Sequence, residues 1–570
     1  MPESITPLKR FINLLKVDRQ DILSVYVYAL FNGIVALSLP LGIQVIINLI
    51  SGGQLATSWI IMVTLVLLGI AFSGFMQIMQ LTVTESIQQK IFARSAFEFA
   101  FRIPKLKLEE VSMEYIPELV NRFFDTLSVQ KGLSKILIDF SSAGLQVIFG
   151  LIVLAFYHPF FVLFGLTLIL IVYVIFKLTG IKGLKASLKE SKYKYEVAHW
   201  LEELARAMET FKLAGKTNLP LHTTDLTVTN YLEARKEHFS ILRLQFAMLV
   251  VFKVIVVSGL LIIGGILVMN DQMNIGQFVA SEIIIILMTN SVEKLIVSTE
   301  TIYDVLTSIE KIGNVTDIPL ENRDGTHKDD IESAALSVEL RNLNYTFHDS
   351  KQPVLKNMSL HLGAGESLCI SGIEGAGKTI LLQLIAGLYE NFDGNILYQG
   401  IPLKNWCKED LYSSIGDHLY KQDIFKGTIR QNITLGRDGI TEQRIRSLCS
   451  LLELDEFLKN LPKGLDSLLF PEGTSIPSRV RLKILLIRGV LTRPKLVLLD
   501  DHFNSLEFNI RSKFIDYLLK EKLTLICVSN KVSVAKKMDT TVILDEGRII
   551  QRAHFDELEK NDLLKLIFRS

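Results

Sequence analysis

The chain has 570 residues, a formal net charge of +1 and a mean hydropathy of +0.34, with 49% hydrophobic residues. This length suggests more than one domain, and a charge near zero gives no support for a nucleic-acid partner. The four cysteines are scattered and form no CxxC pair: Cys369, Cys407, Cys449 and Cys527. Such spacing favours buried thiols in a reducing compartment over disulfides or a zinc site.

The N-terminal half holds six predicted membrane spans. A helix needs about 20 apolar residues to cross a bilayer. The uncharged stretches Ile22–Thr84 and Phe140–Phe176 are each long enough for two spans. Val254–Met269 and Ile275–Met288 supply the fifth and sixth. Buried helices of a large soluble core are the alternative, although uncharged stretches of this length are rare there. Turns between paired spans are expected at residues 51–53, 158–159 and 270–271.

Basic residues distinguish the two sides of this predicted membrane domain. The three short turns contain no Lys or Arg, whereas the connections on the other side are rich in both. Positive residues are retained on the cytoplasmic side of a membrane. We therefore expect a multi-pass protein of the plasma membrane, most simply a bacterial inner membrane, with both termini in the cytoplasm.

The two long internal connections, residues 85–139 and 177–243, are polar and carry apolar residues at three- and four-residue spacing. This spacing predicts helices that continue past the bilayer into the cytosol. Each connection is expected to present a turn to a cytosolic domain, with candidates at Glu114–Arg122 and Glu202–Lys212. A solvated amphipathic face is the alternative interpretation of each.

The composition changes after about residue 320. Residues 1–320 are therefore the predicted transmembrane domain. The polar stretch NRDGTHKDDIE predicts a linker at residues 321–335. Short β-rich runs such as SLCISG, LVLLDD and TLICVSN then alternate with helical stretches. That alternation predicts an α/β domain with a largely parallel sheet over residues 336–570.

The segment SLCISGIEGAGKTILLQLIAGL combines a strand, a glycine-rich loop and a helix. Gly372, Gly377, Lys378 and Thr379 match GxxxxGK[ST] in this context. The backbone N–H groups of such a loop bind a phosphate chain together with the helix N-terminus. We predict ATP as ligand, with Lys378 on the β and γ phosphates and the Thr379 hydroxyl on Mg²⁺. Asp500, at the end of an apolar run, is the predicted second Mg²⁺ partner.

Six spans with long cytosolic connections, followed by a P-loop domain, resemble a half-transporter of the ABC exporter family. The resemblance covers essentially the whole chain and is supported by PVLKNMSLHL, LYKQDIFKGTIRQNI and LPKGLDSLLFPEG. Within the membrane part, PLGIQVIINLI and EKLIVSTETIYDVLTSIEKIG are most similar to peptide and protein exporters of the type I secretion kind. The implied fold class is an α-helical six-span membrane domain followed by an α/β P-loop NTPase domain.

In this family two such domains enclose two ATP molecules, each between one chain's P-loop and the other chain's signature segment. The resemblance places the catalytic glutamate at Asp501, the switch histidine at Asn530 and the LSGGQ signature at residues 476–480. The glutamine that links the γ-phosphate to the membrane domain falls at Tyr420, with Gln422 as a nearby substitute. The implied nucleotide-binding set is Phe347, which stacks on adenine, with Gly372, Gly375, Gly377, Lys378, Thr379, Ile380, Ser478 and Arg479.

These positions depart from the family pattern where hydrolysis is concerned. Asp501 is one methylene shorter than glutamate, and a shift on the order of 1 Å in a catalytic group costs about a hundredfold in rate. Asn530 forms hydrogen bonds but does not titrate as an imidazole does. Pro477 removes a backbone N–H from the signature, and Arg479 replaces a glycine. An alternative is that the Arg479 guanidinium binds phosphate itself, which would favour binding over turnover.

The replaced catalytic acid and the altered signature lie in one chain. Neither a homodimer nor pairing with an intact second half-transporter therefore rebuilds a full consensus site. We expect ATP binding with slow or absent hydrolysis, and moderate turnover with a rearranged signature is the alternative. The chain is therefore expected to be an ABC-type transporter ATPase with weak hydrolysis.

Two functions fit the sequence. The first is a slow exporter of peptide, protein or other amphipathic cargo. The second is an ATP-binding, hydrolysis-deficient membrane scaffold or regulatory subunit that organises partners such as a periplasmic adaptor. Glu282 in the sixth span is expected either to contact cargo or protons or to be structural. Lys253, near the start of the fifth span, is expected to extend to the membrane interface.

Overall fold

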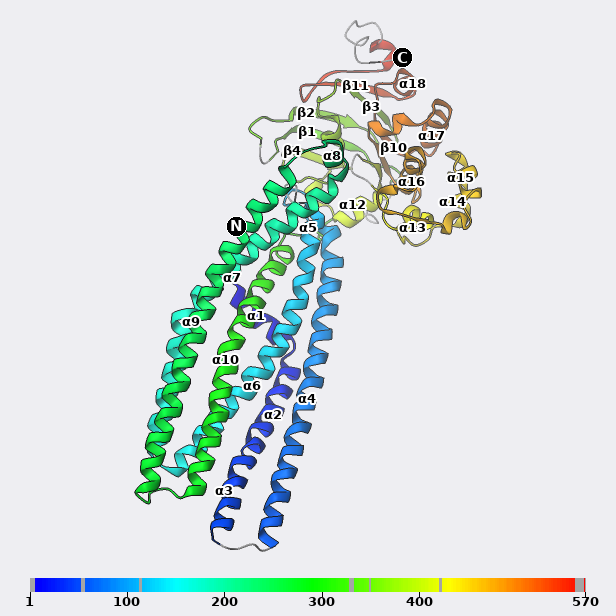
Figure 1. The fold of residues 1–570 in the computed structure, drawn as a ribbon. Coiled ribbons are helices and arrows are strands. Elements are labelled where there is room, and N and C mark those ends of the chain that lie inside the picture. The colour runs from blue at the N-terminus through cyan, green and yellow to red at the C-terminus, as the bar shows by residue number, and fades with distance from the viewer. Residues whose placement is uncertain are drawn as a thin grey trace. The chain divides into compact units, whose positions relative to one another are not determined.

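The structure is a computed structural model whose chain divides into two compact units (Figure 1). One unit contains Met1–Pro104 and Glu114–Ile318, and the other contains Lys105–Met113 and Pro319–Ser570. The residues that the structure describes are 6–52, 57–111, 115–327, 333–347, 350–419, 423–558 and 568.

The first unit is helical. Its elements are α1 (Pro7–Val17), α2 (Arg19–Ala36), α3 (Ser38–Ser51), α4 (Thr57–Arg102), α5 (Ile116–Asn121), η2 (Arg122–Phe124), α6 (Asp125–Tyr157), α7 (Phe160–Arg206), α8 (Met208–Leu213), α9 (Leu219–Met269) and α10 (Ile275–Thr316). A short 3-10 turn, η1 (Ile103–Lys105), follows α4.

Among the described residues, six helical segments are long and apolar enough to cross a membrane, which confirms the predicted number of spans. The paired spans break where the sequence predicts, since α6 ends before His158 and α9 ends before Asn270. Helix α9 has 51 residues, or roughly 75 Å of helix. The hydrocarbon core of a bilayer is only about 30 Å thick, so this helix continues well beyond it.

Helix α10 lies at the centre of the first unit. Half of its most apolar window is buried, whereas only 11% of the corresponding window of the α4 segment is buried. It packs along α6, where two glycines leave no room for a side chain. A Cβ at Gly132 would stand 2.3 Å from Val305, and one at Gly150 would stand 2.7 Å from Met288. Small residues at such contacts let membrane helices approach closely.

The second unit is an α/β domain with two main sheets. The strands are β1 (Val338–Tyr345), β2 (Leu355–Leu362), β3 (Ser367–Gly372), β4 (Asp393–Tyr398), β5 (Ile401–Pro402), β6 (Ile415–His418), β7 (Gly427–Thr428), β8 (Leu468–Leu469), β9 (Leu496–Leu499), β10 (Thr524–Val528), β11 (Thr540–Asp545) and β12 (Arg548–Ala553). One sheet is antiparallel with order β2-β1-β4-β5, and the other has order β12-β11-β3-β10-β9-β6. In the second sheet only the edge strand β12 runs antiparallel to its neighbour.

Helices cover both faces of the six-stranded sheet. They are α11 (Lys378–Ile385), α12 (Lys408–Ser414), α13 (Ile429–Thr434), α14 (Glu442–Leu451), α15 (Asp455–Lys459), α16 (Ser478–Val490), α17 (Phe508–Lys520), α18 (Val532–Ala535) and α19 (Phe555–Leu558), with 3-10 turns η4 (Leu403–Asn405), η5 (Gly464–Asp466), η6 (Pro471–Gly473) and η7 (Asp501–Ser505).

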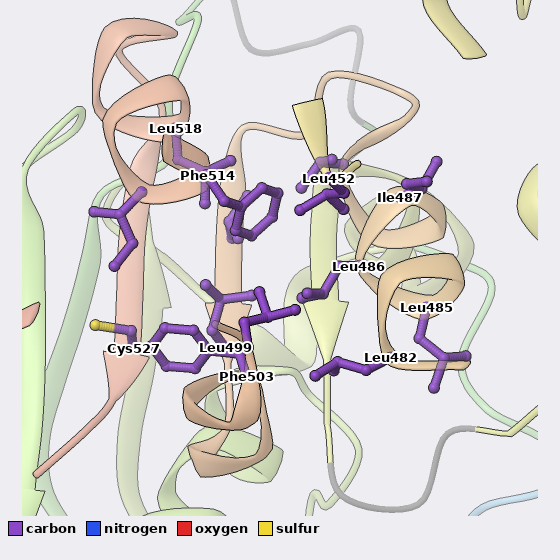
Figure 2. Close-up of a cluster of buried hydrophobic side chains, with 14 of the residues drawn as sticks. Leu452, Leu482, Leu485, Leu486, Ile487, Leu499, Phe503, Phe514, Leu518 and Cys527 are labelled. Carbon is purple, nitrogen blue, oxygen red and sulfur yellow. The ribbon is translucent and has the colours of Figure 1, made fainter. Parts of the chain in front are cut away.

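Alternate residues of the central strands enter two different apolar cores. Cys527 of β10 and Leu499 of β9 pack with α16 and α17 on one face, which Figure 2 shows with Leu486 and Phe514. Their neighbours along the strands, including Ile526, pack on the other face. Successive side chains of a strand point to opposite faces, so uninterrupted apolar strands are expected in a sheet that is buried on both sides.

The division between the units differs from the predicted boundaries in two ways. Residues 319–327, predicted as transmembrane end and linker, lie against the α/β domain: Thr326 N–H donates to the Asn405 carbonyl (2.8 Å). Residues 105–111 of the first internal connection also belong to the second unit, where Leu106 pairs with Leu320. Composition does not show to which unit these two segments belong. Only backbone pairing between distant parts of the chain assigns them to the second unit.

Candidate nucleotide-binding site

The predicted site residues meet at one edge of the six-stranded sheet. The P-loop follows β3, Asn530 follows β10, and Asp500 follows β9. These three strands are parallel neighbours, so their carboxyl ends lie side by side. Ligands of open α/β sheets bind at this edge.

The P-loop glycines occupy backbone conformations that disfavour side chains. Gly375 and Gly377 have φ values of 84° and 93°. A Cβ at Gly377 would stand 2.8 Å from Leu355, whereas one at Gly375 would meet open space. The loop therefore combines tight packing beneath it with an unfilled surface above, which fits a phosphate chain bound by backbone N–H groups.

Lys378 holds the loop in shape. Its Nζ donates to the carbonyls of Gly372 (2.8 Å) and Ile373 (2.7 Å). Burial lowers the pKa of the Lys378 ammonium, while the nearby charges of Asp501 and Asp500 act in the opposite direction. A cation held at the mouth of a glycine-rich loop suits contact with the terminal phosphates of a nucleotide.

Thr379 and Asp500 lie together, as predicted for a magnesium site. The Thr379 hydroxyl donates to Asp500 Oδ2 (3.2 Å), and the carboxylate also accepts from the Asp501 N–H (2.8 Å). Asp500 is only 2% exposed, and this burial raises the pKa of its carboxyl. Hydroxyl and carboxylate oxygens are the ligands that Mg²⁺ prefers, so these residues fit the ion. When bound, the ion would neutralise charge on the phosphate oxygens.

Asn530 is tied to the base of the P-loop. Its Oδ1 accepts from the Ser371 hydroxyl (2.7 Å) and the Gly372 N–H (3.2 Å), and its Nδ2 donates to the Gly372 carbonyl (3.1 Å). Both ends of the amide are thus used within the domain. Asn530, predicted to stand at the switch-histidine position, therefore fastens the phosphate loop to the end of β10.

Asp501 is held by the turn that follows it. Its Oδ1 accepts from Asn504 Nδ2 (2.7 Å), which also donates to the Val528 carbonyl. Asn504 Oδ1 accepts from the Ser529 hydroxyl (2.8 Å). Asn504 thereby connects the acid to the strand end beside Asn530, a role that the sequence alone does not indicate.

The segment predicted to hold the signature starts a helix. Pro477 directly precedes α16, which begins at Ser478. The Arg479 guanidinium pairs with Glu507 (2.9 Å), and both side chains are more than half exposed. An exposed pair of this kind contributes only about 0–1 kcal/mol, so an anion can compete for the guanidinium at little cost.

A cavity of about 350 Å³ lies beside this helix and was not predicted. It is lined by His418, Leu419, Ser478, Arg479, Arg481, Leu482, Leu485, His502 and Ser505. His418 is 5% exposed, and burial, followed by the charge of His502, lowers its pKa to about 4. His418 ends β6, and His502 follows β9. Their position at strand ends is the sequence signal that could have indicated them as site residues.

The remaining predicted positions divide into two groups. Phe347 is partly exposed, with its ring edge-on to that of Tyr345 (centroids 5.2 Å apart), and Ile380 is half-buried in α11. Adenine stacking on Phe347 stays a prediction. Tyr420 and Gln422 lie outside the described residues.

The segment 105–111 contacts the α/β domain through charged side chains. Lys107 Nζ lies 2.9 Å from Glu390, and Glu109 accepts from the backbone N–H of Asn391 (2.6 Å). The predicted turn further along, α5 with η2, belongs to the other unit, as does the second candidate turn. The pattern of residues 105–111 is too short for periodicity in the sequence to indicate this contact.

The membrane unit contains a cavity of about 690 Å³ between α4 and α6, with a mixed lining: Leu81, Thr82, Thr84, Glu85, Gln88, Lys131, Ser134, Lys135, Ile138 and Asp139. Glu282 is half-buried on α10. Lys253, predicted to extend to the membrane interface, pairs with Glu293 of α10 (2.5 Å).

Comparison with known proteins agrees with this architecture. The model of the ABC transporter transmembrane region matches residues 22–292, and the ABC transporter model matches residues 355–504. Together the two matches cover well over half of the chain. The chain belongs to the ABC transporter family, and one transmembrane region joined to one such domain makes it a half-transporter of the exporter type.

Individual relatives are distant. The chain is 29% identical over 262 residues to the ABC transporter ATP-binding protein YfiC of Bacillus subtilis, covering 45% of this chain and 43% of YfiC. It is 26% identical over 263 residues to YfiB of the same organism, covering 46% and 45%. The chain thus aligns with less than half the length of these curated relatives. A bacterial Atm1-family ABC exporter, solved with ATP bound, shares the fold with a TM-score of 0.84 at 18% identity, over 96% of this chain and 97% of that one.

Proposed function

We propose that two copies of this chain, or this chain and a second half-transporter, form an exporter that binds Mg–ATP and hydrolyses it slowly. The cargo is a peptide, a protein or another amphipathic molecule. Both termini lie in the cytoplasm of a cell whose plasma membrane, a bacterial inner membrane in this proposal, the six spans cross.

The contrast within the site carries this proposal. The groups for nucleotide and magnesium binding are complete, since Lys378 lies at the P-loop mouth and Thr379 beside Asp500. The groups for hydrolysis are replaced and occupied: Asp501 is bonded to Asn504, and Asn530 to the loop base. Binding without rapid turnover follows from such an arrangement.

In this family each ATP site is built from two chains, so the replaced groups of this chain affect both sites of any dimer it forms. In a homodimer, each ATP would face one Asp501 and one altered signature with Pro477 and Arg479. An intact partner chain would repair half of each site and complete neither. A carboxylate displaced on the order of 1 Å costs about a hundredfold in rate, and the altered signature adds to that loss.

The cargo class is supported by the membrane cavity. Its wall presents Leu81 and Ile138 together with the opposite charges of Glu85 and Lys135. A surface with apolar and charged groups side by side suits an amphipathic molecule better than a purely apolar one. The peptide-exporter resemblance of the membrane sequence points the same way.

The test is steady-state phosphate release by the purified protein in lipid, measured together with nucleotide binding. We expect tight Mg–ATP binding and slow hydrolysis, with both lost in Lys378→Ala. A variant that restores the family residues at six of the altered positions should hydrolyse ATP at least about 100 times faster than the natural sequence. It carries Pro477→Ser, Ser478→Gly, Arg479→Gly, Val480→Gln, Asp501→Glu and Asn530→His. A natural chain as fast as this variant would overturn the proposal.

A second function, a nucleotide-binding scaffold that organises partners such as a periplasmic adaptor, is supported by the same replaced groups. The two functions differ in turnover. ATP binding with no phosphate release above that of Lys378→Ala would favour the scaffold, whereas a slow rate that disappears in Lys378→Ala would favour the exporter.

A further inference from the structure

A histidine, a cysteine and an aspartate gather at the surface of the second unit, away from the nucleotide site. They are His327, Cys407 and Asp410, and one ligand atom from each lies within 4.8 Å of the other two. His327 Nδ1 is 2.5 Å from Asp410 Oδ2. The thiol is buried, the carboxylate is half-buried and the imidazole is exposed.

The backbone holds these residues together although 80 positions separate the first two. Thr326 N–H donates to the Asn405 carbonyl (2.8 Å), and Cys407 N–H donates to the Thr326 carbonyl (3.1 Å). Gly325 permits this approach, because a Cβ there would stand 2.4 Å from the Asn405 carbonyl oxygen. His327 is therefore placed beside Cys407 by main-chain bonds and not by chance contact of long side chains.

Cys407 is an unusual residue at its place in the fold. It stands at the N-cap of α12, where Ser, Thr, Asp and Asn are preferred because their oxygens accept from the helix N–H groups. The Cys407 side chain makes no such capping bond. Its sulfur belongs instead to the cluster with the imidazole and the carboxylate.

We propose that His327, Cys407 and Asp410 bind one zinc-class divalent cation. Thiolate, imidazole and carboxylate are the three ligand types that Zn²⁺ accepts, and three protein ligands leave a fourth tetrahedral position for water. The exposed imidazole gives the ion an entry path. A thiolate and a carboxylate together balance the charge of a divalent ion, and the thiol loses its proton on binding.

Such a site would fasten the segment that contains His327, within the predicted linker, to the start of α12. His327 is supplied by that segment, whereas Cys407 and Asp410 come from the start of α12. The cysteine spacing alone predicts no zinc site. It could not reveal this one, because only one of the three ligands is a cysteine and His327 lies far from it in the chain. Only the fold brings the three together.

The experiment is titration of the purified, metal-stripped full-length protein with Co²⁺ alone and then Zn²⁺ alone, in the absence of nucleotide. We expect one Co²⁺ per chain, with a thiolate-to-metal charge-transfer band that Zn²⁺ displaces. Cys407→Ser should abolish the band, and His327→Gln and Asp410→Asn should each weaken binding at least about tenfold. Cys449→Ser, which alters another buried cysteine of the same unit, is the matched control and should leave the band unchanged.

Zn²⁺ should also raise the melting temperature of the natural chain by roughly 5–10 °C at about 100 times the dissociation constant, and not that of Cys407→Ser. Mg–ATP binding by each variant checks that it is folded. Absence of a thiolate band, or a band that persists in Cys407→Ser, would overturn the proposal and leave His327 and Asp410 as a simple hydrogen-bonded pair.

Discussion

Replacing Asn530 by alanine removes three hydrogen bonds that join the end of β10 to the P-loop. The Gly372 carbonyl keeps Lys378 Nζ as a donor at 2.8 Å, so it stays satisfied. The Ser371 hydroxyl, which is fully buried, and the Gly372 N–H both lose the acceptor. A buried polar group without a partner costs about 1–3 kcal/mol, so we expect a loss of about 2 kcal/mol in unfolding free energy.

For a domain of this size, that loss corresponds to a fall in melting temperature of about 4–8 °C. The assay is thermal unfolding of the purified protein in lipid, with and without Mg–ATP. Nucleotide affinity should fall as well, because the loop is less firmly shaped. Asn395→Ala, at an exposed asparagine on β4, is the matched control and should shift the melting temperature by less than about 1 °C. An Asn530→Ala variant that behaves like this control would refute the view that the amide fastens the loop.

Three further predictions concern buried charges. Burial lowers the pKa of His418 to about 4, below its ordinary value near 6.5, so stability should be complete above pH 7 and fall by about 3 kcal/mol as pH drops from 6.5 to 4. His418→Gln should flatten that dependence in melting curves at pH 7.5 and 5, and equal slopes would contradict the assignment. Glu390→Gln should cost about 3 kcal/mol, because Lys408, 1% exposed and 3.0 Å from Glu390, would keep its buried charge and lose the carboxylate with which it pairs. A melting temperature within 2 °C of the natural chain would speak against this. Asp500→Asn should remove the magnesium dependence of ATP affinity in a binding titration, whereas a variant that still responds to Mg²⁺ would show that the ion is held elsewhere.

The sequence by itself determined the features that are written in contiguous residues. Uncharged stretches of bilayer length predicted six spans because hydrophobic length is a local property, and the structure confirms that number. The P-loop could be recognised for the same reason, since its glycines, Lys378 and Thr379 act within one strand, loop and helix. Family membership followed from the order of these two parts.

Tertiary structure decided what the residues at the predicted site positions contact. Asn530 is joined to Gly372 across 158 positions, and Arg479 to Glu507 across 28. Residues 105–111 reach Glu390, and His327 reaches Asp410, only because backbone segments far apart in the chain pair with one another. Strand order and segment pairing depend on the packing of the whole domain, whereas hydrophobic patterns report only on neighbours in the sequence. For that reason the motif located the P-loop, but the sequence did not reveal how the groups around it are held.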